Sequence, residues 1–450
     1  MPVFAPSPES NSPFSLPGTL DLRASYEAVA YSGAAIRFAE PDAIAAMATL
    51  HGLTPPAPDR CRVLDLGCAS ATNLIAMAFR LPKSTFVGVD FAPSQIESGR
   101  WVVSELGLRN VDLQARSIAD IGEADGVFDY IICHGVYSWV PPDVQDAILR
   151  VCSSNLAPNG VAYVSYNTYP GWHRRGMLRD MLMFNDDPSR DPGERVARAR
   201  ALASALASVD SANPSAHARI LREEAAQLAE QADRHLFHEQ LEAWNDPVYF
   251  AEFILRAGLH HLRYVADVQT TAETEATAAF REALGDTVDP IRLEQYLDFV
   301  RGRQFRKSLL CHDSAQPSSE LQADAPRRLV VRSLCAAAEP NPEDAARGPG
   351  VAAFQAMDGA KVTTNNPLVI AALRALMAAA PAALSLEELE RAATAAVASD
   401  DGADATLCAA LLSSARGGLV EFRVLPWKWP VAPSALPKAS ALARWEALHS

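Results

Sequence analysis

The sequence predicts an α/β protein whose core is a mostly parallel β-sheet with helices on both faces. Between residues 62 and 167, short apolar runs alternate with segments of helical periodicity, the pattern of strands joined by crossover helices. The runs are nearly continuous in apolar residues, as expected for strands buried on both faces. The length of 450 residues is too great for one ordinary domain and predicts two or three.

Five strands and three helices are expected in this first region, in the manner of a Rossmann-like sheet. The expected strands are Arg62–Leu66, Thr85–Asp90, Val111–Arg116, Phe128–Cys133 and Val161–Tyr166. The expected helices are 71–80, 93–106 and 142–156. Such a sheet places the carboxyl ends of its strands along one edge, where doubly wound folds bind their ligands. Together with the preceding segment, these elements form a core domain over residues 26–173.

A helical insertion is expected before the sheet is completed. Residues 174–242 are rich in Ala, Arg and Glu and contain no strand signal. A helix at 246–257 and strands at Leu259–Val268 and Phe305–His312 follow. We therefore expect residues 243–312 to close the sheet as an edge hairpin.

Beyond the sheet, the sequence predicts a second, smaller domain. Residues 313–328 are polar and contain proline, which is typical of a linker. Residues 329–427 hold a strand-like run, three helices and a final strand, which predicts a winged-helix-like α+β domain. The three helices are expected at 366–379, 385–397 and 404–415. Residues 1–25 are expected to be a disordered lead, and residues 428–450 a tail.

Composition excludes several classes of function. The net charge of −14 repels phosphate backbones, so a nucleic-acid partner is not expected. No apolar run reaches the roughly 18 residues of a membrane span, so membrane insertion is not expected either. The seven cysteines form no CxxC pair and are odd in number, which argues against a disulfide framework or a metal site. With no signal-peptide pattern at the N-terminus, these features predict a cytoplasmic protein.

The most informative motif, VLDLGCASA, follows the first strand. Asp65 and Gly67 are followed by Cys68 and Ala69, and such small side chains let the backbone approach a ligand above the strand end. Cys68 is expected to be a small buried residue and not a nucleophile. A dinucleotide site would favour G-x-G-x-x-G, whereas Thr72 occupies the third glycine slot. Asp65 would repel a pyrophosphate but attract the amino group of S-adenosylmethionine (SAM).

Asp90 ends the second expected strand and is the expected ribose ligand. It follows Gly67 by about 20 positions, the spacing of the acidic residue that binds ribose in dinucleotide folds. A turn or cap role is the alternative for Asp90. Phe91 is expected beside the cofactor, and Ser117 and Ile118 are expected to flank its adenine ring, although Ile118 could equally belong to the core.

Two aromatic loops are expected at the same edge of the sheet. The candidate substrate-binding residues from these loops are Trp139, Asn167, Trp172 and His173. Aromatic walls can hold an alkylammonium group by cation–π attraction. Packing of the two tryptophans onto the sheet is an equal alternative. A lysine acceptor must lose a proton before it is methylated, and the candidate catalytic residues for this step are His134, Tyr137 and Tyr169.

Several longer segments resemble a known family. DLGCAS, CHGVYSWVP, YNTYPGWH, FHEQLEAWNDPVYFAEF and FRKSLLCH are similar to segments of bacterial class I SAM-dependent methyltransferases that carry a methyltransferase regulatory domain. This group includes protein-lysine methyltransferases of rickettsial outer-membrane proteins. The resemblance covers about residues 26–427 and implies a Rossmann-like SAM domain with helical dimerisation and C-terminal modules.

The resemblance also implies the cofactor site. The implied SAM-binding residues are Asp65, Gly67, Ala69, Asp90, Ser117, Ile118 and His134. Tyr26 and Tyr31, in the N-terminal lead, are expected to lie over the cofactor. Ala71 departs from the family pattern, because many relatives have glycine there. Relatives also often continue beyond the point that corresponds to Ser450.

The resulting hypothesis is a SAM-dependent methyltransferase that acts on protein lysine side chains, for example in an outer-membrane protein before export. Two alternatives stay open, a small-molecule N- or O-methyltransferase and a SAM-binding scaffold protein without turnover. A homodimer is an open assembly state. Methyl transfer itself requires only that the acceptor, methyl carbon and sulfur be held in line with water excluded.

Overall fold

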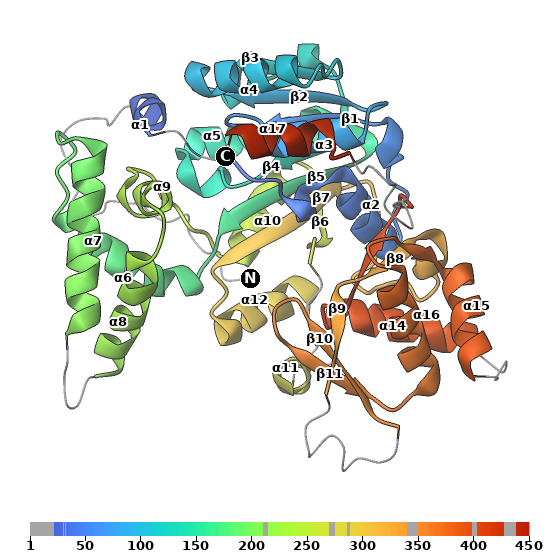
Figure 1. Ribbon diagram of the computed structural model, residues 1–450. Helices are drawn as coiled ribbons and strands as arrows, with labels where there is room; N and C mark the ends of the chain where they lie inside the picture. The colour runs from blue at the N-terminus through green and yellow to red at the C-terminus, as the bar shows by residue number, and fades with distance from the viewer. Residues whose placement is uncertain are drawn as a thin grey trace.

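The computed structural model describes residues 22–29, 31, 33–209, 215–269, 275–285, 289–339, 350–397, 403–426 and 438–449. Its centre is a seven-stranded sheet in the order β3-β2-β1-β4-β5-β7-β6 (Figure 1). The strands are β1 (Arg62–Leu66), β2 (Thr85–Asp90), β3 (Val111–Ala115), β4 (Phe128–Cys133), β5 (Leu156–Asn167), β6 (Leu262–Asp267) and β7 (Phe305–His312). Strands β1 to β5 pair in parallel, and β7 is antiparallel to both β5 and β6. The predicted Rossmann-like sheet is confirmed.

Helices cover both faces of this sheet, as the apolar strands require. One face is covered by α2 (Pro41–Leu50), α3 (Thr72–Arg80) and α4 (Pro93–Glu105), whose buried side chains share a core with the C-terminal domain. The other face is covered by α5 (Pro142–Ser154) and α10 (Phe250–Leu259). Each crossover helix thus buries an apolar side against the strands that it joins.

The expected edge hairpin is only partly right. Strands β6 and β7 do pair, with Leu262 opposite His312. However, α11 (Glu275–Leu284) and α12 (Pro290–Arg301) lie between them in the chain, and β7 is inserted between β5 and β6.

The short helices of the first half are α1 (Leu22–Ala28), η1 (Arg37–Ala39), η2 (Pro58–Arg60), η3 (Ile118–Asp120), η4 (Glu123–Asp125) and η5 (Tyr137–Trp139).

The insertion after β5 is helical throughout its described part. It consists of α6 (Gly171–Phe184), α7 (Pro192–Ser208), α8 (Ala216–Ala229), α9 (Asp233–Leu236) and the π-helix η6 (Phe237–Leu241). These helices bury a small apolar core of their own. The α6–α8 group stands beside the sheet, on the side away from the C-terminal domain (Figure 1).

The C-terminal domain contains the predicted three helices and an additional sheet. Its helices are α14 (Pro367–Ala379), α15 (Leu386–Val397) and α16 (Ala403–Arg416). They pack with a sheet in the order β12 (Leu384–Ser385), β8 (Val330–Ser333), β13 (Val420–Arg423), which is winged-helix-like. A second antiparallel sheet, not predicted, has the order β11 (Lys361–Thr364), β10 (Ala352–Ala356), β9 (Cys335–Ala338).

The C-terminal domain is attached to α2 by buried ion pairs. The fully buried Arg423 guanidinium donates to Glu40 at 2.9 Å and to Glu421 at 2.6 Å. The expected linker also packs along α2, because the Ser318 and Gln322 amides donate to carbonyl groups at its C-terminal end. This segment contains η7 (Ala325–Arg328).

The two ends of the chain are described only in part. Residues 1–21 of the expected lead and residues 427–437 near the expected tail lie outside the described ranges. The last four residues of the expected disordered lead, 22–25, are instead helical in α1, and α17 (Ala441–His449) lies in the expected tail. All seven cysteines are free thiols. In the part of the chain that is described, no helix has the length and apolarity that a bilayer span requires.

Candidate functional site

The loop between β1 and α3 is shaped so that its backbone can lie against a ligand. The amides of Gly67 and Cys68 donate to the Val89 carbonyl at 2.8 and 3.0 Å, which ties the loop to β2. Gly67 has a φ of +73°, and a Cβ there would lie 2.5 Å from a methyl carbon of Val136. Ala69 also adopts a positive φ, of 48°. Only very small residues fit this turn.

Asp90, the expected ribose ligand, stands beside this loop. Its carboxylate accepts hydrogen bonds from the Ala69 amide at 2.9 Å and the Ala92 amide at 3.0 Å. Burial raises the pKa of Asp90, and these amide bonds oppose that shift. A carboxylate offers about four acceptor positions, and those that the amides of Ala69, Phe91 and Ala92 leave are open to ribose hydroxyls.

Asp65 is a buried carboxyl that fits a cationic ligand group. It is 4% exposed, and no described residue donates a hydrogen bond to it. Burial raises its pKa to about 7, with a further contribution from the charge of Asp90. A buried carboxylate without a partner is costly, and the amino group of SAM would remove this cost. We call Asp65, Asp90 and the loop 67–71 the cofactor edge.

The N-terminal segment reaches this edge, as the resemblance implied. The Tyr26 ring contacts Phe91 edge-on at 5.7 Å and stacks on His238 at 5.0 Å. Tyr31 lies farther out, 40% exposed, and contacts His238 edge-on. Tyr26 thus contacts both Phe91 and the regulatory region, whereas Tyr31 contacts the regulatory region.

The other expected cofactor residues differ in their surroundings. Ser117 is half-buried, and its hydroxyl caps η3 by accepting from the Ala119 amide at 3.2 Å. Ile118 is 8% exposed and belongs to the apolar core, the alternative considered for it. Cys68 is buried as expected, and burial raises the pKa of its thiol well above the ordinary value.

His134 begins the loop after β4 as a neutral ring. Its Nδ1 lies 2.8 Å from the Tyr163 hydroxyl and 3.3 Å from the Ser165 hydroxyl. Burial, with the nearby charge of Lys307, lowers the pKa of His134 to about 4. The imidazole is therefore uncharged at neutral pH and fixed in orientation by β5.

Two expected substrate-facing aromatics belong to the core instead. Tyr137 is fully buried, and its ring packs edge-on against Phe253 at 5.2 Å and Tyr166 at 6.1 Å. Tyr137 is thus part of the core in this structure, and its catalytic role stays a prediction. Trp172 is 2% exposed and meets the half-buried Trp139 edge-on at 6.1 Å, so packing onto the sheet explains Trp172.

Tyr169 and His173 form an accessible aromatic group with a third residue. Their rings stack at 4.2 Å, and His173 Nε2 lies 3.2 Å from the Tyr249 hydroxyl. Tyr249 also lies 5.3 Å from the Tyr169 ring. Burial raises the pKa of Tyr169, and the negative charge of Asp246 adds to this effect. Asp246 precedes Tyr249 by three residues in the same segment.

The segment 245–249 joins this site from the regulatory region. The Val248 amide donates to the Asn167 carbonyl at 3.1 Å, and the Asp246 amide donates to the Ser138 carbonyl at 2.7 Å. The Asn167 side chain donates to Asn245 at 3.0 Å. This segment belongs to one of the stretches that resemble the family, but none of its residues was predicted to be part of a site. We call this segment together with the loops 134–139 and 167–173 the substrate edge.

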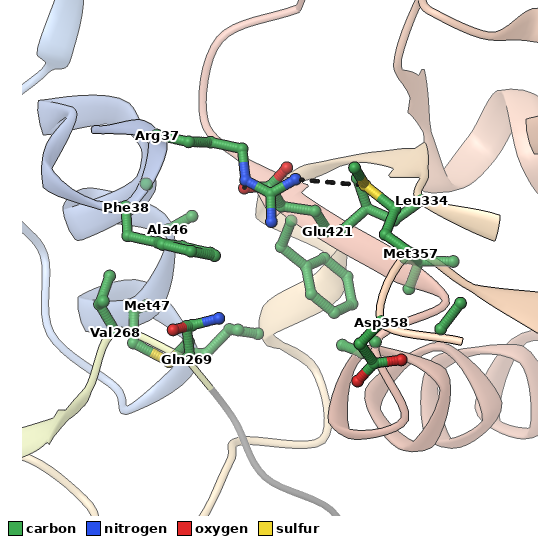
Figure 2. A pocket seen from close by; sticks show the side chains of 17 residues that line it. Arg37, Phe38, Ala46, Met47, Val268, Gln269, Leu334, Met357, Asp358 and Glu421 are labelled. Atoms are coloured by element: carbon green, nitrogen blue, oxygen red, sulfur yellow. Dashed lines mark hydrogen bonds and ion pairs between the residues drawn. The ribbon is translucent and has the colours of Figure 1, made fainter. Parts of the chain in front are cut away.

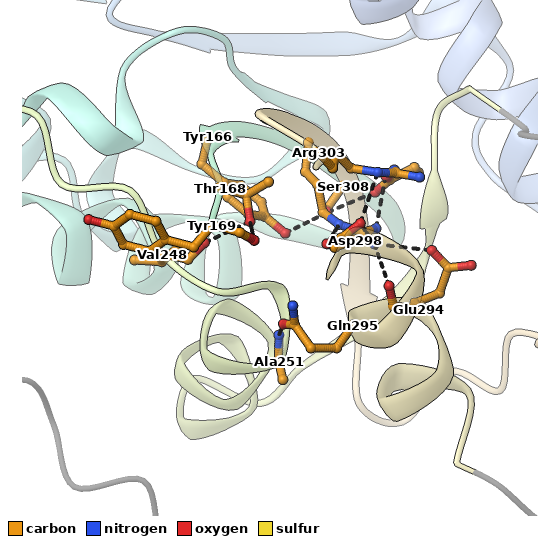
Figure 3. A network of polar contacts seen from close by, with 12 residues as sticks. Tyr166, Thr168, Tyr169, Val248, Ala251, Glu294, Gln295, Asp298, Arg303 and Ser308 are labelled. Atoms are coloured by element: carbon orange, nitrogen blue, oxygen red, sulfur yellow. Dashed lines mark hydrogen bonds and ion pairs between the residues drawn. The ribbon is translucent and has the colours of Figure 1, made fainter. Parts of the chain in front are cut away.

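A buried ionic network supports the substrate edge from β7 (Figure 3). Arg306 is 1% exposed and donates to both carboxylate oxygens of Asp298 at 2.8 Å. Ser308, its neighbour on the same strand, lies 3.0 Å from the Tyr166 hydroxyl. Thr168 donates to the Val248 carbonyl at 2.7 Å, which closes the link to segment 245–249. The position of the loop after β5 thus depends on this network.

A cavity lies outside both edges. It has a volume of about 180 Å³ and is bounded by α2 and the C-terminal domain, with Arg37, Phe38, Met357 and Glu421 in its wall (Figure 2). It contains none of the predicted site residues. Among the described residues, no group of His, Cys, Asp and Glu is arranged to hold a metal ion.

Comparison with known proteins identifies two family domains. Residues 58–188 match a methyltransferase domain, and residues 232–312 match a predicted methyltransferase regulatory domain. The uncharacterized protein RP789 of Rickettsia prowazekii is 38% identical over 309 residues, which cover 68% of this chain but 56% of that protein. The uncharacterized protein RP028 of the same organism is 38% identical over 233 residues, which cover 52% of this chain and 93% of that protein.

Solved structures extend this similarity to nearly the whole chain. PKMT2 from Rickettsia typhi superposes with a TM-score of 0.81 at 30% identity, covering 93% of this chain and 82% of that one. A second structure of PKMT2, in complex with AdoHcy, gives a TM-score of 0.78 at 29% identity. SAM is the cofactor of such methyltransferase domains, and Asp65, Asp90 and the small-residue loop are suited to hold it. The chain therefore belongs to the SAM-dependent methyltransferases that carry a methyltransferase regulatory domain.

Proposed function

We propose that this chain is an active methyltransferase that transfers methyl groups from SAM to lysine side chains of proteins. The observation that carries the proposal is the substrate edge, where two loops and a distant segment bring aromatic rings together with the carboxylate of Asp246. The sequence resemblance to protein-lysine methyltransferases and the structural likeness to PKMT2 support the same substrate class. Cytoplasmic location and a homodimer stay predictions.

Asp246 and the aromatic rings have the chemistry to hold a lysine side chain. Asp246 is half-buried and accepts one hydrogen bond from the Gln145 amide at 3.2 Å. A carboxylate can accept several further bonds, so it has capacity for an ammonium group. The rings of Tyr169 and Tyr249 lie 5.3 Å apart, with Tyr249 in the same segment as Asp246, and they can pack against the aliphatic stem or attract the charge.

Proton removal from the lysine depends on the surroundings more than on a strong base. SAM supplies the methyl group on a positively charged sulfur. His134, with its pKa of about 4, is uncharged and adds no repulsion against an incoming ammonium group. Partial burial between aromatic rings lowers the pKa of the lysine, so its proton can pass to water or to a neighbouring acceptor. His134 and Tyr169 are the proposed neighbours of the amine at this step, and the proton passes to water, because a ring with a pKa of about 4 and a protonated phenol are poor acceptors.

Mapping of transferred methyl groups tests the proposal. The full chain is incubated with methyl-labelled SAM, a panel of purified proteins that includes outer-membrane proteins, and a panel of small metabolites. We expect label on lysine Nζ atoms, located by mass spectrometry, and much less label with the Asp90→Asn variant at limiting SAM. Label found only in small molecules would contradict the lysine assignment. SAM binding without any transfer would contradict the enzymatic assignment.

A further inference from the structure

The regulatory region contains a buried histidine–glutamate pair that contacts the N-terminal segment. His238 is 3% exposed and Glu242 is 2% exposed. His238 Nδ1 lies 2.8 Å from a Glu242 carboxylate oxygen, and its Nε2 lies 3.0 Å from the Val29 carbonyl. The Val29 carbonyl can only accept, so Nε2 donates to it. One side chain therefore joins the regulatory region to the backbone of the N-terminal segment.

Two further contacts connect this pair to residues 22–29, which we call the N-terminal cover. The Ser25 hydroxyl lies 3.0 Å from each carboxylate oxygen of Glu242. The Tyr26 ring stacks on the His238 ring at 5.0 Å. The cover is thus held by contacts along its length, at Ser25, Tyr26 and Val29.

The cover bridges the regulatory region and the cofactor edge. Tyr26 contacts Phe91, the residue directly after Asp90, at 5.7 Å. The Ser94 amide, at the start of α4, donates to Glu27 at 3.3 Å. Helix α1 has seven residues, and a helix this short is not stable in water by itself. Its position beside Asp90 therefore depends on the partners that hold it.

We propose that His238 and Glu242 are positioning residues that clamp the N-terminal cover over the bound cofactor and so set the rate at which the cofactor leaves. The inference rests on the proposed function, because it assumes that SAM binds at the cofactor edge. SAM and its product exchange when Ser25, Tyr26 and Val29 separate from the pair. The regulatory region would then act on the methyltransferase domain through cofactor retention.

Binding of S-adenosylhomocysteine to the full chain tests the clamp without requiring turnover. The variants are Ser25→Ala and Glu242→Gln, and the measurements are the Kd by calorimetry and the dissociation rate by stopped flow. Loss of a charge-assisted hydrogen bond predicts a rise in Kd of about tenfold or more, mainly through faster dissociation. Ser25→Thr keeps the hydroxyl and should restore tight binding. In turnover, KM for SAM should rise while kcat does not fall.

A second histidine–carboxylate pair provides the matched control. His260 Nε2 lies 2.8 Å from Asp146, outside both edges, and His260→Ala should leave the Kd unchanged. An unchanged Kd and dissociation rate in Ser25→Ala and Glu242→Gln would overturn the clamp, even if the wild-type chain binds the ligand and methylates lysine. Failure of the wild-type chain to bind S-adenosylhomocysteine would overturn the proposed function as well. If Glu242→Gln fails to fold, Ser25→Ala and Ser25→Thr still decide the question.

Discussion

The cofactor edge and the substrate edge lie at the carboxyl ends of the same sheet but are built in different ways. The cofactor edge uses two aspartates and one short loop, all within residues 65–92, and its geometry comes from backbone hydrogen bonds. The substrate edge joins three segments that are far apart in the sequence, through both backbone and side-chain hydrogen bonds. The first edge is therefore specified locally, whereas the second depends on the completed fold.

The largest effect should come from breaking the network beneath the substrate edge. Asp298→Ala removes two hydrogen bonds from the buried Arg306 guanidinium, which keeps Asp267 and Glu294, and loss of one member of a buried ion pair typically costs about 3–5 kcal/mol. Chemical denaturation should show a decrease of that size in the free energy of unfolding. Asp112→Ala, on the exposed side of β3, is the control. A decrease below about 1 kcal/mol would mean that the network does not hold this edge.

Asp90→Asn should weaken cofactor binding at the cofactor edge and leave the structure of the substrate edge intact. We expect SAM binding to weaken about 100-fold, because the charge that accepts the ribose hydroxyls is lost. The amide oxygen of asparagine can keep one bond to the Ala69 or Ala92 amide, so the protein should remain folded. Calorimetric titration with SAM measures the effect. Wild-type affinity in this variant would exclude Asp90 as the ribose ligand.

Asp246→Asn should separate the functions of the two edges. We expect kcat/KM for a lysine-containing substrate to fall about 10- to 100-fold, since an ammonium group loses its charged partner. The Kd for SAM should not change, because Asp246 lies outside the cofactor edge. Methylation kinetics and calorimetry on the same preparation test both statements. Equal loss of SAM binding would show that the two edges are not independent.

The pH dependence of SAM binding should report on Asp65. With its pKa raised to about 7, Asp65 is partly protonated in the ligand-free protein at neutral pH. The folded protein holds the Asp65 proton more tightly than the unfolded chain does. This difference contributes to the free energy of unfolding below about pH 4, and the contribution is lost as the pH rises through 7. SAM favours the charged carboxylate, so its affinity should fall about tenfold from pH 8 to pH 6.

Calorimetry in buffers of different ionisation enthalpy should detect the proton released at pH 6. Asp65→Asn removes the titrating group, and this variant should bind SAM with a weaker affinity that varies little over the same range. A wild-type affinity that is equally independent of pH would contradict a charged contact between Asp65 and the cofactor.

The smallest effect should come from Ala71, where many relatives have glycine. Ala71 adopts a φ of 60°, so the backbone already has the left-handed conformation that glycine favours. Ala71→Gly should therefore change the Kd for SAM by less than about threefold. Ala71→Val should instead disrupt the loop, because a β-branched residue does not tolerate a positive φ. Similar behaviour of the two variants would contradict this explanation.

The contrast between the locally built cofactor edge and the substrate edge also explains which features could be predicted from the sequence. The strand ends, the small-residue loop and Asp90 lie within a short stretch, so periodicity and spacing were sufficient to locate them. The Rossmann-like sheet and the three C-terminal helices were predicted for the same reason. The sheet β9–β11 was not predicted, because the runs of alanine in β9 and β10 carry no clear strand signal.

The substrate edge could not be assembled from the sequence. Asn245 and Asp246 precede a proline in a segment without periodicity, and their partners are about 80 and 100 positions earlier in the chain. Tyr137 has the residue type expected of a catalytic group, yet its burial against Phe253 becomes visible only when α10 packs on the sheet. Residue type alone does not distinguish a core aromatic from a substrate-facing one.

A crystal structure of the full chain with bound S-adenosylhomocysteine tests the central claim most directly. We predict that both ribose hydroxyls contact the Asp90 carboxylate, that the amino group lies near Asp65, and that the sulfur faces the loop containing His134. A ligand bound elsewhere, such as in the cavity beside Arg37, would contradict the assignment of the cofactor edge and the mechanism built on it.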